Sequence, residues 1–265
     1  MIVSLKELGH TVAMTGDGVN DILAFKEADC SIAMASGSDA AKNAANLVLL
    51  DNNFSAMPHI VNEGRRVINN ITKSASMFLI KTIFSIFISI STIFFGQTYP
   101  FDPIQLSLIS SFGVGIPTFL LTYESNFTKI SGNFFRNILE NALPSAFIIA
   151  LGATLITNIG HLLGYDNNML STLCVLFTGW NYAIALKRVY APLTLYRKLV
   201  IYITQFIYYL ALIIGRSLLE LTELPFVWLI ILLGLFALSL PLTELVQHLF
   251  IKLEKLIIRY REKKI

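Results

Sequence analysis

The chain has 265 residues, of which 55% are hydrophobic and only 14% are charged, and its formal net charge is +3. Charged residues make up about 25% of an ordinary soluble domain, so this composition excludes a disordered chain, a coiled coil and a typical soluble protein. The charges are also uneven: residues 1–73 hold 14, residues 74–249 hold 15 and the last 16 residues hold eight. These numbers predict a small soluble front, a large membrane body and a basic tail, and they argue against nucleic-acid binding.

The front of the chain alternates short apolar runs with helix-like stretches over residues 11–50. The order strand, helix, strand, helix, strand predicts parallel pairing in a layered α/β unit. Three strands and two helices are too few for a stable domain of this kind, so we expect the chain to lack the N-terminal part of that domain. The predicted strands are 11–15, 30–34 and 47–50, and the predicted helices are 20–28 and 38–46.

A stalk helix is predicted next, over residues 58–73. It starts at Pro58, and the sequence contains no proline or glycine between Arg65 and Phe95. Because nothing in that stretch is expected to break a helix, a single helix should lead from the soluble front into the bilayer.

Six stretches are apolar and long enough to cross about 30 Å of hydrocarbon as helices. Twelve Lys and Arg residues lie in the tail and in the connections after the second and fourth stretches, against one in the other connections. This bias predicts that the front, these two connections and both termini are cytosolic, in a multi-pass protein of the plasma membrane. An all-α soluble core is the alternative. The six stretches are 74–95, 104–123, 144–163, 169–186, 199–214 and 226–245.

The most specific local feature is the string MTGDGVND at residues 14–21, directly after the first predicted strand. Open α/β sheets bind ligands at the carboxyl ends of their strands. Gly16 and Gly18 permit a tight turn, and the spacing of Asp17 and Asp21 brings two carboxylates to one side of a helix opening. Hard oxygen ligands suit Mg²⁺ beside a phosphate. The motif therefore predicts a metal site for phosphoryl transfer, and a surface turn with acidic caps is the alternative.

Residues 15–54, which begin TGDGVND, and the later EGRRVINNI of residues 63–71 closely resemble the end of the phosphorylation domain of P-type ATPases. These are ion pumps that form an aspartyl-phosphate. The resemblance implies that Asp17 holds the Mg²⁺ that bridges to the aspartyl-phosphate. It also implies that Asn20 and Asp21 support the metal and the phosphate, and that the two glycines of the motif shape the turn.

The resemblance implies a partial α/β phosphorylation domain of the haloacid dehalogenase type, followed by a six-helix transmembrane bundle. These six helices would be the fifth to tenth of a full pump. Such pumps carry the phosphorylated Asp in an upstream DKTGT motif, which this sequence lacks. We therefore expect a C-terminal fragment that hydrolyses no ATP alone, and that binds ATP only with the missing N-terminal half. Its expected partners are that half or a full-length pump, the bilayer and a transported cation. The predicted division is 1–57 phosphorylation domain, 58–73 stalk, 74–249 bundle and 250–265 basic tail.

The ion pathway is expected where Gly113, Gly115 and Pro117 interrupt the second span. Proline removes a backbone donor, and the freed carbonyls can coordinate a cation, although a simple packing kink is the alternative. Lys81 is predicted at a similar depth and could act as a built-in counter-cation. Alternatively, it extends toward the cytosol and Glu124. The neighbouring polar candidates are Thr82, Ser85, Ser107, Ser110 and Ser111.

The sequence departs from the pattern of calcium and sodium pumps at this pathway. Ser85, Ser110 and Val114 stand where the resemblance would place Glu, Asn and Asp. A cation remains the leading interpretation, with calcium or magnesium favoured by a resemblance to bacterial pumps with a Gly-Ile-Pro signature. A pump for lipids or peptides is one alternative, and an inactive or regulatory membrane fragment is another.

Overall fold

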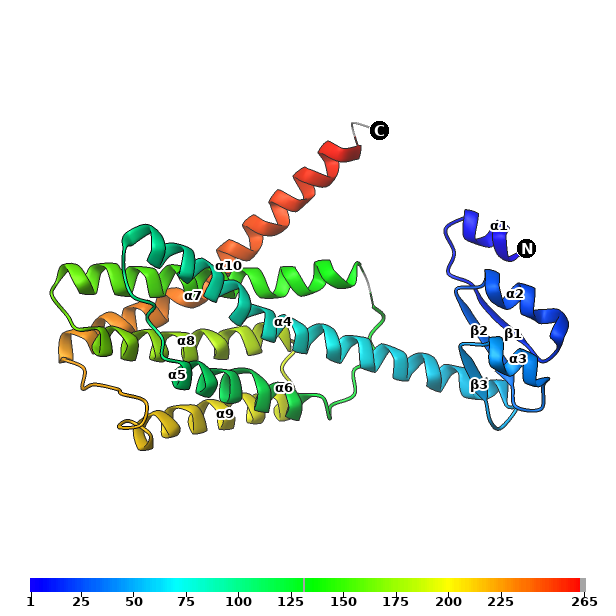
Figure 1. Cartoon of the computed structure of the whole chain (residues 1–265), viewed down its shortest axis with the longest axis horizontal. Helices are drawn as coiled ribbons and strands as arrows, with labels where there is room; N and C mark the ends of the chain where they lie inside the picture. The colour runs from blue at the N-terminus through cyan, green and yellow to red at the C-terminus, as the bar shows by residue number, and fades with distance from the viewer. Residues whose placement is uncertain (131, 263–265) are drawn as a thin grey trace. The chain divides into compact units, whose positions relative to one another are not determined.

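The computed structural model describes residues 1–130 and 132–262, without the side chains of 254, 255 and 257–262. The chain separates into two compact units, a front unit of residues 1–64 and a membrane unit that begins at Arg65 (Figure 1).

The front unit contains a parallel three-stranded sheet in the order β1 (Ala13–Gly16), β2 (Cys30–Met34), β3 (Leu47–Leu49). This order confirms the predicted strand–helix alternation, and β2 occupies the predicted residues. The first predicted helix begins with a 3₁₀ turn, and a short helix at the N-terminus was not predicted. The helices of this unit are α1 (Ile2–Glu7), η1 (Val19–Asp21), α2 (Ile22–Glu27), α3 (Asp39–Ala44) and η2 (Phe54–Ala56).

The core of the front unit is small: Phe25, Ala33 and Ala41 form one buried cluster, and Ile32 and Leu49 are also buried. Both α2 and α3 pack on β2 and on each other, so they cover the same face of the sheet (Figure 1). The helix α3 starts at its N-cap Ser38, whose hydroxyl accepts a hydrogen bond from the Ala41 N–H at 3.1 Å. Because β1 and β2 are parallel, the loops that follow them lie at the same edge of the sheet.

The membrane-spanning part begins with α4 (Met57–Phe95), a continuous helix of 39 residues that covers both the predicted stalk and the first predicted span. Over the described residues, six helical stretches are long and apolar enough to cross a membrane. This agrees with the six predicted spans. The later single-helix spans are α7 (Phe134–Leu162), α8 (Asn167–Val189), α9 (Leu195–Ile214) and α10 (Phe226–Glu262).

The second span is interrupted at the predicted place, but the interruption is a π-helix and not an unwound segment. The span consists of α5 (Pro103–Leu108), the π segment η3 (Ile109–Gly115) and α6 (Ile116–Leu121). Pro117 has no N–H to continue the α-helical pattern, and a shift to wider i→i+5 bonds accommodates that loss.

The bundle core is centred on α8, which packs against α7, α9, α10 and the π segment. Three glycines permit close approach, because a Cβ at Gly152, Gly160 or Gly179 would lie within 2.2 Å of a neighbouring side chain. The predicted basic tail of residues 250–265 is not a separate segment, since α10 continues to Glu262. The last three residues lie outside the described part of the chain.

Candidate functional site

The TGDGVND motif forms a tight turn that its own aspartate holds closed. One carboxylate oxygen of Asp21, Oδ2, accepts hydrogen bonds from the backbone N–H groups of Asp17 and Gly18, both at 3.1 Å. A Cβ at Gly16 would lie 2.5 Å from that oxygen, so only glycine fits there. The two predicted metal-binding carboxylates therefore have different surroundings. The Asp21 carboxylate bonds back to the turn, whereas the Asp17 side chain is exposed.

The loop after β2 closes on this turn from the neighbouring strand. The backbone N–H of Ser38 donates to the Asp17 carbonyl at 2.8 Å. A Cβ at Gly37 would lie 2.6 Å from that carbonyl oxygen and 2.9 Å from the Asp17 Cα. Sequence reasoning missed Gly37, although a glycine directly before an N-capping serine is a recognisable signal for a tight loop.

The fit of a magnesium ion can be judged from the oxygen donors at this edge. Asp17 and Asn20 are exposed, and one Asp21 oxygen is committed to backbone N–H groups. Within the described residues, no group of three or more His, Cys, Asp or Glu side chains could enclose a metal. Mg²⁺ commonly uses one or two carboxylates and takes its other ligands from water and phosphate. The exposed Asp17 carboxylate at the carboxyl edge of β1 fits this way of binding Mg²⁺, in which the protein does not supply all the ligands.

In the membrane unit, Lys81 and Ser110 of the predicted ion pathway lie together. The ammonium Nζ of Lys81 on α4 donates to the Ser110 hydroxyl at 2.6 Å, and that hydroxyl donates to the Leu106 carbonyl at 2.6 Å. In this structure Lys81 does not reach Glu124, because its ammonium bonds to Ser110, whereas Glu124 pairs with Arg197. Lys81 therefore lies at the interrupted helix, as the depth argument predicted.

The other predicted pathway residues are distributed over several faces. Ser85 accepts a hydrogen bond from the Tyr99 hydroxyl at 3.2 Å, whereas Thr82 and Ser111 are exposed. Ser107 is also exposed, and its hydroxyl bonds within its own helix. The predicted glycine and proline positions of the second span are less exposed than these polar residues. Gly113 and Pro117 are buried, and a Cβ at Gly115 would lie 3.3 Å from the Ser110 carbonyl.

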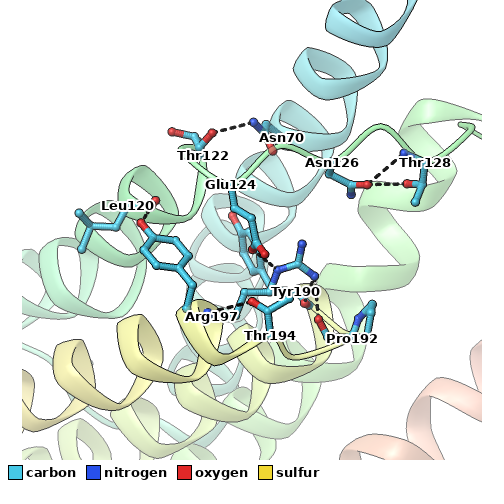
Figure 2. Close-up of polar contacts among 11 residues, drawn as sticks. Asn70, Leu120, Thr122, Glu124, Asn126, Thr128, Tyr190, Pro192, Thr194 and Arg197 are labelled. Atoms are coloured by element: carbon cyan, nitrogen blue, oxygen red, sulfur yellow. Dashed lines mark hydrogen bonds and ion pairs between the residues drawn. The ribbon is translucent and has the colours of Figure 1, made fainter.

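A buried arginine anchors the connection after α6. The Arg197 guanidinium donates through Nε to Glu124, and through Nη1 to the carbonyls of Tyr190 at 2.9 Å and Pro192 at 2.7 Å. Its side chain is only 9% exposed. Figure 2 shows these groups converging on the guanidinium from the connections on either side. Charge-assisted bonds of this kind are stronger than neutral ones, so Arg197 joins the two connections firmly.

The same connection is held from its other side by α4. The Asn70 amide donates to the Thr122 carbonyl at 3.2 Å (Figure 2). The Asn69 amide donates to the carbonyls of Asn126 at 3.1 Å and Thr128 at 3.0 Å. Residues 122–128 thus form a bridge between α4 and the start of α9. We call these residues the α6–α7 bridge. Sequence reasoning did not identify it, although two adjacent asparagines inside a long helix are an unusual feature.

Comparisons with known proteins agree with the resemblance seen in the sequence. A family model described as haloacid dehalogenase-like hydrolase matches residues 5–61. The chain is 43% identical over 209 residues to a probable cation-transporting ATPase, exp7, of Streptococcus pneumoniae, and this match covers 76% of the chain and 27% of the relative.

Two further relatives carry the name of calcium-transporting ATPases. The chain is 40% identical over 176 residues to CtpE of Mycolicibacterium smegmatis, covering 63% of the chain and 22% of the relative. It is 36% identical over 122 residues to a calcium-transporting ATPase of Bacillus subtilis, covering 46% and 14%. The matches thus span about a quarter or less of the length of these relatives. With its haloacid dehalogenase-like region and six apolar helices, the chain is a membrane protein homologous to the cation-transporting ATPases of the P-type family.

Proposed function

We propose that the chain acts as the C-terminal part of an ATP-driven cation pump, in which phosphate chemistry in the front unit drives ion movement through the helices. The observation that carries this proposal is the TGDGVND turn at the carboxyl edge of a parallel sheet, in a chain that also holds six membrane-spanning helices. The proposed division is a phosphorylation-domain part to residue 57, a stalk to residue 73 and then the bundle. The distribution of Lys and Arg supports a cytosolic front and cytosolic termini.

In the front unit, we assign metal binding to the Asp17 carboxylate. Bound Mg²⁺ would supply positive charge next to the phosphoryl oxygens. Asp21 holds the Asp17 and Gly18 N–H groups in place, and Asn20 offers an exposed amide at the same edge. Gly16 leaves room for the Asp21 carboxylate, and Gly37 lets the second loop approach Asp17 closely enough for this arrangement. ATP is expected to act through parts of the pump other than these residues.

In the membrane unit, we assign the ion pathway to the interrupted second span and the adjoining face of α4. The Lys81 ammonium contacts Ser110 there, inside the π segment. An ammonium at this position would take the place of a counter-transported ion when the pathway is empty. The names of two relatives favour calcium as the cargo.

The proposal can be tested with a chimera in which this chain replaces the matching region of the pneumococcal relative. Everted membrane vesicles that contain the chimera are expected to take up ⁴⁵Ca²⁺ when ATP is added. Asp17→Asn should abolish this uptake, because an amide cannot replace the metal-binding carboxylate. Asp51→Asn, an exposed aspartate of the same unit, is the matched control and should leave the uptake unchanged. Normal uptake by the Asp17→Asn chimera would exclude the assigned metal role.

A further inference from the structure

Two lysines and a tyrosine meet where α8 and α9 pack together at one end of the bundle. Lys187 lies in the last turn of α8, and Lys198 and Tyr202 lie near the start of α9. The Lys187 ammonium is 4.8 Å from the centroid of the Tyr202 ring, which is a cation–π contact. Lys198 precedes Tyr202 by one helical turn on the same side of α9. We call these three residues the α8–α9 basic cluster.

The positive charge of this cluster is not neutralised by the protein around it. Neither lysine forms an ion pair with an acidic side chain among the residues that the structure describes. The Glu124 carboxylate, which reaches the start of α9, bonds to Arg197 instead. Lys198 also lies in the first turn of α9, where the aligned peptide dipoles favour negative charge. An anion at this place would therefore be attracted by both lysines and by the start of the helix.

The two lysines lie at the edge of the predicted hydrocarbon layer. The fourth predicted span ends at residue 186, directly before Lys187, and the fifth begins at residue 199, directly after Lys198. Lysine side chains at such positions extend their ammonium groups to the level of the lipid headgroups, and tyrosine rings are enriched at the same level. The cluster is therefore placed at the depth of the lipid phosphates.

An exposed apolar surface begins directly beside the cluster. Leu199, Tyr202, Ile203 and Phe206 of α9 are all more than half exposed. These residues recur at intervals of three and four, so they form one stripe along the helix. The stripe runs from the lysines into the predicted fifth span. This order of surfaces, basic and then apolar, matches an amphipathic ligand with a negative head and apolar chains.

We propose that the α8–α9 basic cluster binds the phosphate of an anionic phospholipid, whose acyl chains lie along the exposed stripe of α9. Basic residues between membrane helices at the headgroup level are suited to anionic lipid heads. Phosphatidylglycerol carries one net negative charge, whereas phosphatidylcholine adds a quaternary ammonium that both lysines repel. A soluble anion would use the lysines but not the stripe. This inference goes beyond the proposed function, because it concerns a lipid and does not depend on which ion is moved.

The experiment titrates the full 265-residue chain in detergent with phosphatidylglycerol or phosphatidylcholine, and native mass spectrometry gives the Kd of each lipid. We expect phosphatidylglycerol to bind more tightly. The double variant Lys187→Gln/Lys198→Gln should bind phosphatidylglycerol about 25-fold more weakly, because each lysine beside an anionic headgroup strengthens binding about fivefold. Its Kd for phosphatidylcholine should not change. The double variant Lys187→Arg/Lys198→Arg keeps both charges and should retain the binding.

Lys129→Gln is the matched control. Lys129 is an exposed lysine in the connection after α6, and the Glu124–Arg197 pair joins that connection to the start of α9. The substitution thus removes the same charge from the same end of the bundle, outside the cluster. The Kd of phosphatidylglycerol should stay unchanged in this variant. The lipid assignment is overturned if the two lipids bind the unsubstituted chain equally, or if Lys129→Gln weakens phosphatidylglycerol binding as much as Lys198→Gln does.

A second measurement separates a lipid from a free phosphate ion. In nanodiscs, the unfolding temperature of the unsubstituted chain should rise when phosphatidylglycerol replaces part of the phosphatidylcholine, because a ligand of the folded state stabilises it. The double glutamine variant should lose that rise. Inorganic phosphate, added to phosphatidylcholine nanodiscs at equal ionic strength, should not produce it. An equal rise with inorganic phosphate would overturn the assignment to a lipid.

Discussion

The two units of the chain hold their functional residues in place by different physical means. In the front unit, the candidate metal turn is shaped by hydrogen bonds at an exposed edge, and the unit contains only five buried hydrophobic residues. In the membrane unit, a large continuous core positions the helices, and the main ion pair of the α6–α7 bridge is mostly buried. When a hydrogen bond is removed by substitution, water can take its place in the front unit but cannot readily do so inside the membrane unit.

The largest effect is therefore expected at the buried arginine. Arg197→Met should destabilise the folded chain by about 3–5 kcal/mol, because Glu124 and two carbonyls lose their shared donor in a poorly hydrated place. Unfolding in nanodiscs would measure this loss. Arg216→Gln is the matched control, since Arg216 pairs with Glu223 while both side chains are largely exposed. That pair should contribute only about 0–1 kcal/mol. Equal losses for the two variants would contradict the comparison.

A steric change should have the next largest effect. Gly179→Ala places a Cβ about 2.2 Å from Tyr208, whose ring is buried and whose hydroxyl is bonded. Because the ring cannot move away freely, we expect a loss of about 1–3 kcal/mol. Gly234→Ala is the control, since a Cβ there meets nothing within 4 Å. Matching unfolding temperatures for the two variants would contradict the close α8–α9 packing at Gly179.

The front unit should respond more weakly to the removal of a polar group. Asp21→Ala removes the acceptor of two N–H groups, but water can reach this exposed edge, so the expected loss is only about 1 kcal/mol. Hydrogen exchange should show faster exchange at the Asp17 and Gly18 amides, with little change in β2. Asp51→Ala is the control for removing a carboxylate. A destabilisation as large as that of Arg197→Met would remove the distinction between the units.

The smallest effect is a pH dependence in the front unit. The pKa of Asp29 lies below its ordinary value of 3.8, first because the Val12 N–H donates to its carboxylate and second because Lys6 pairs with it. A lowered folded-state pKa contributes stability at neutral pH, and this contribution is lost as the pH falls through that pKa. Asp29→Asn should thus be slightly less stable than the unsubstituted chain at neutral pH. The difference should disappear in strong acid, as acid titration of unfolding would show, and a constant difference would contradict the assignment.

The parts of the structure that sequence reasoning predicted depend on local patterns. The strand Cys30–Met34 is a short apolar run between turn residues, and the structure has it at those residues. The interruption of the second span follows from Pro117, whose missing N–H acts on its own helix. The helix predicted over residues 20–28 instead starts as a 3₁₀ turn, in which the Asp21 carboxylate turns back to the N–H groups of Asp17 and Gly18.

The parts that escaped prediction are contacts between residues far apart in the chain. Lys81 and Ser110 are 29 positions apart, and Glu124 and Arg197 are 73 positions apart. Sequence placed Lys81 at the right depth but left open whether it would reach Glu124. The structure decides this, because the Lys81 ammonium bonds to Ser110 and Glu124 pairs with Arg197.

The amino-acid sequence by itself determined the two-part organisation, the parallel pairing of the strands and the six spans. Each of these follows from periodicity, composition or backbone chemistry within a few neighbouring residues. Only the tertiary structure decided that Asp21 serves the turn, that Gly37 lets a second loop reach Asp17, and that Tyr182 lies on Gly113. These outcomes depend on which faces of separate elements pack together, and close packing selects those faces through the shape of the whole core.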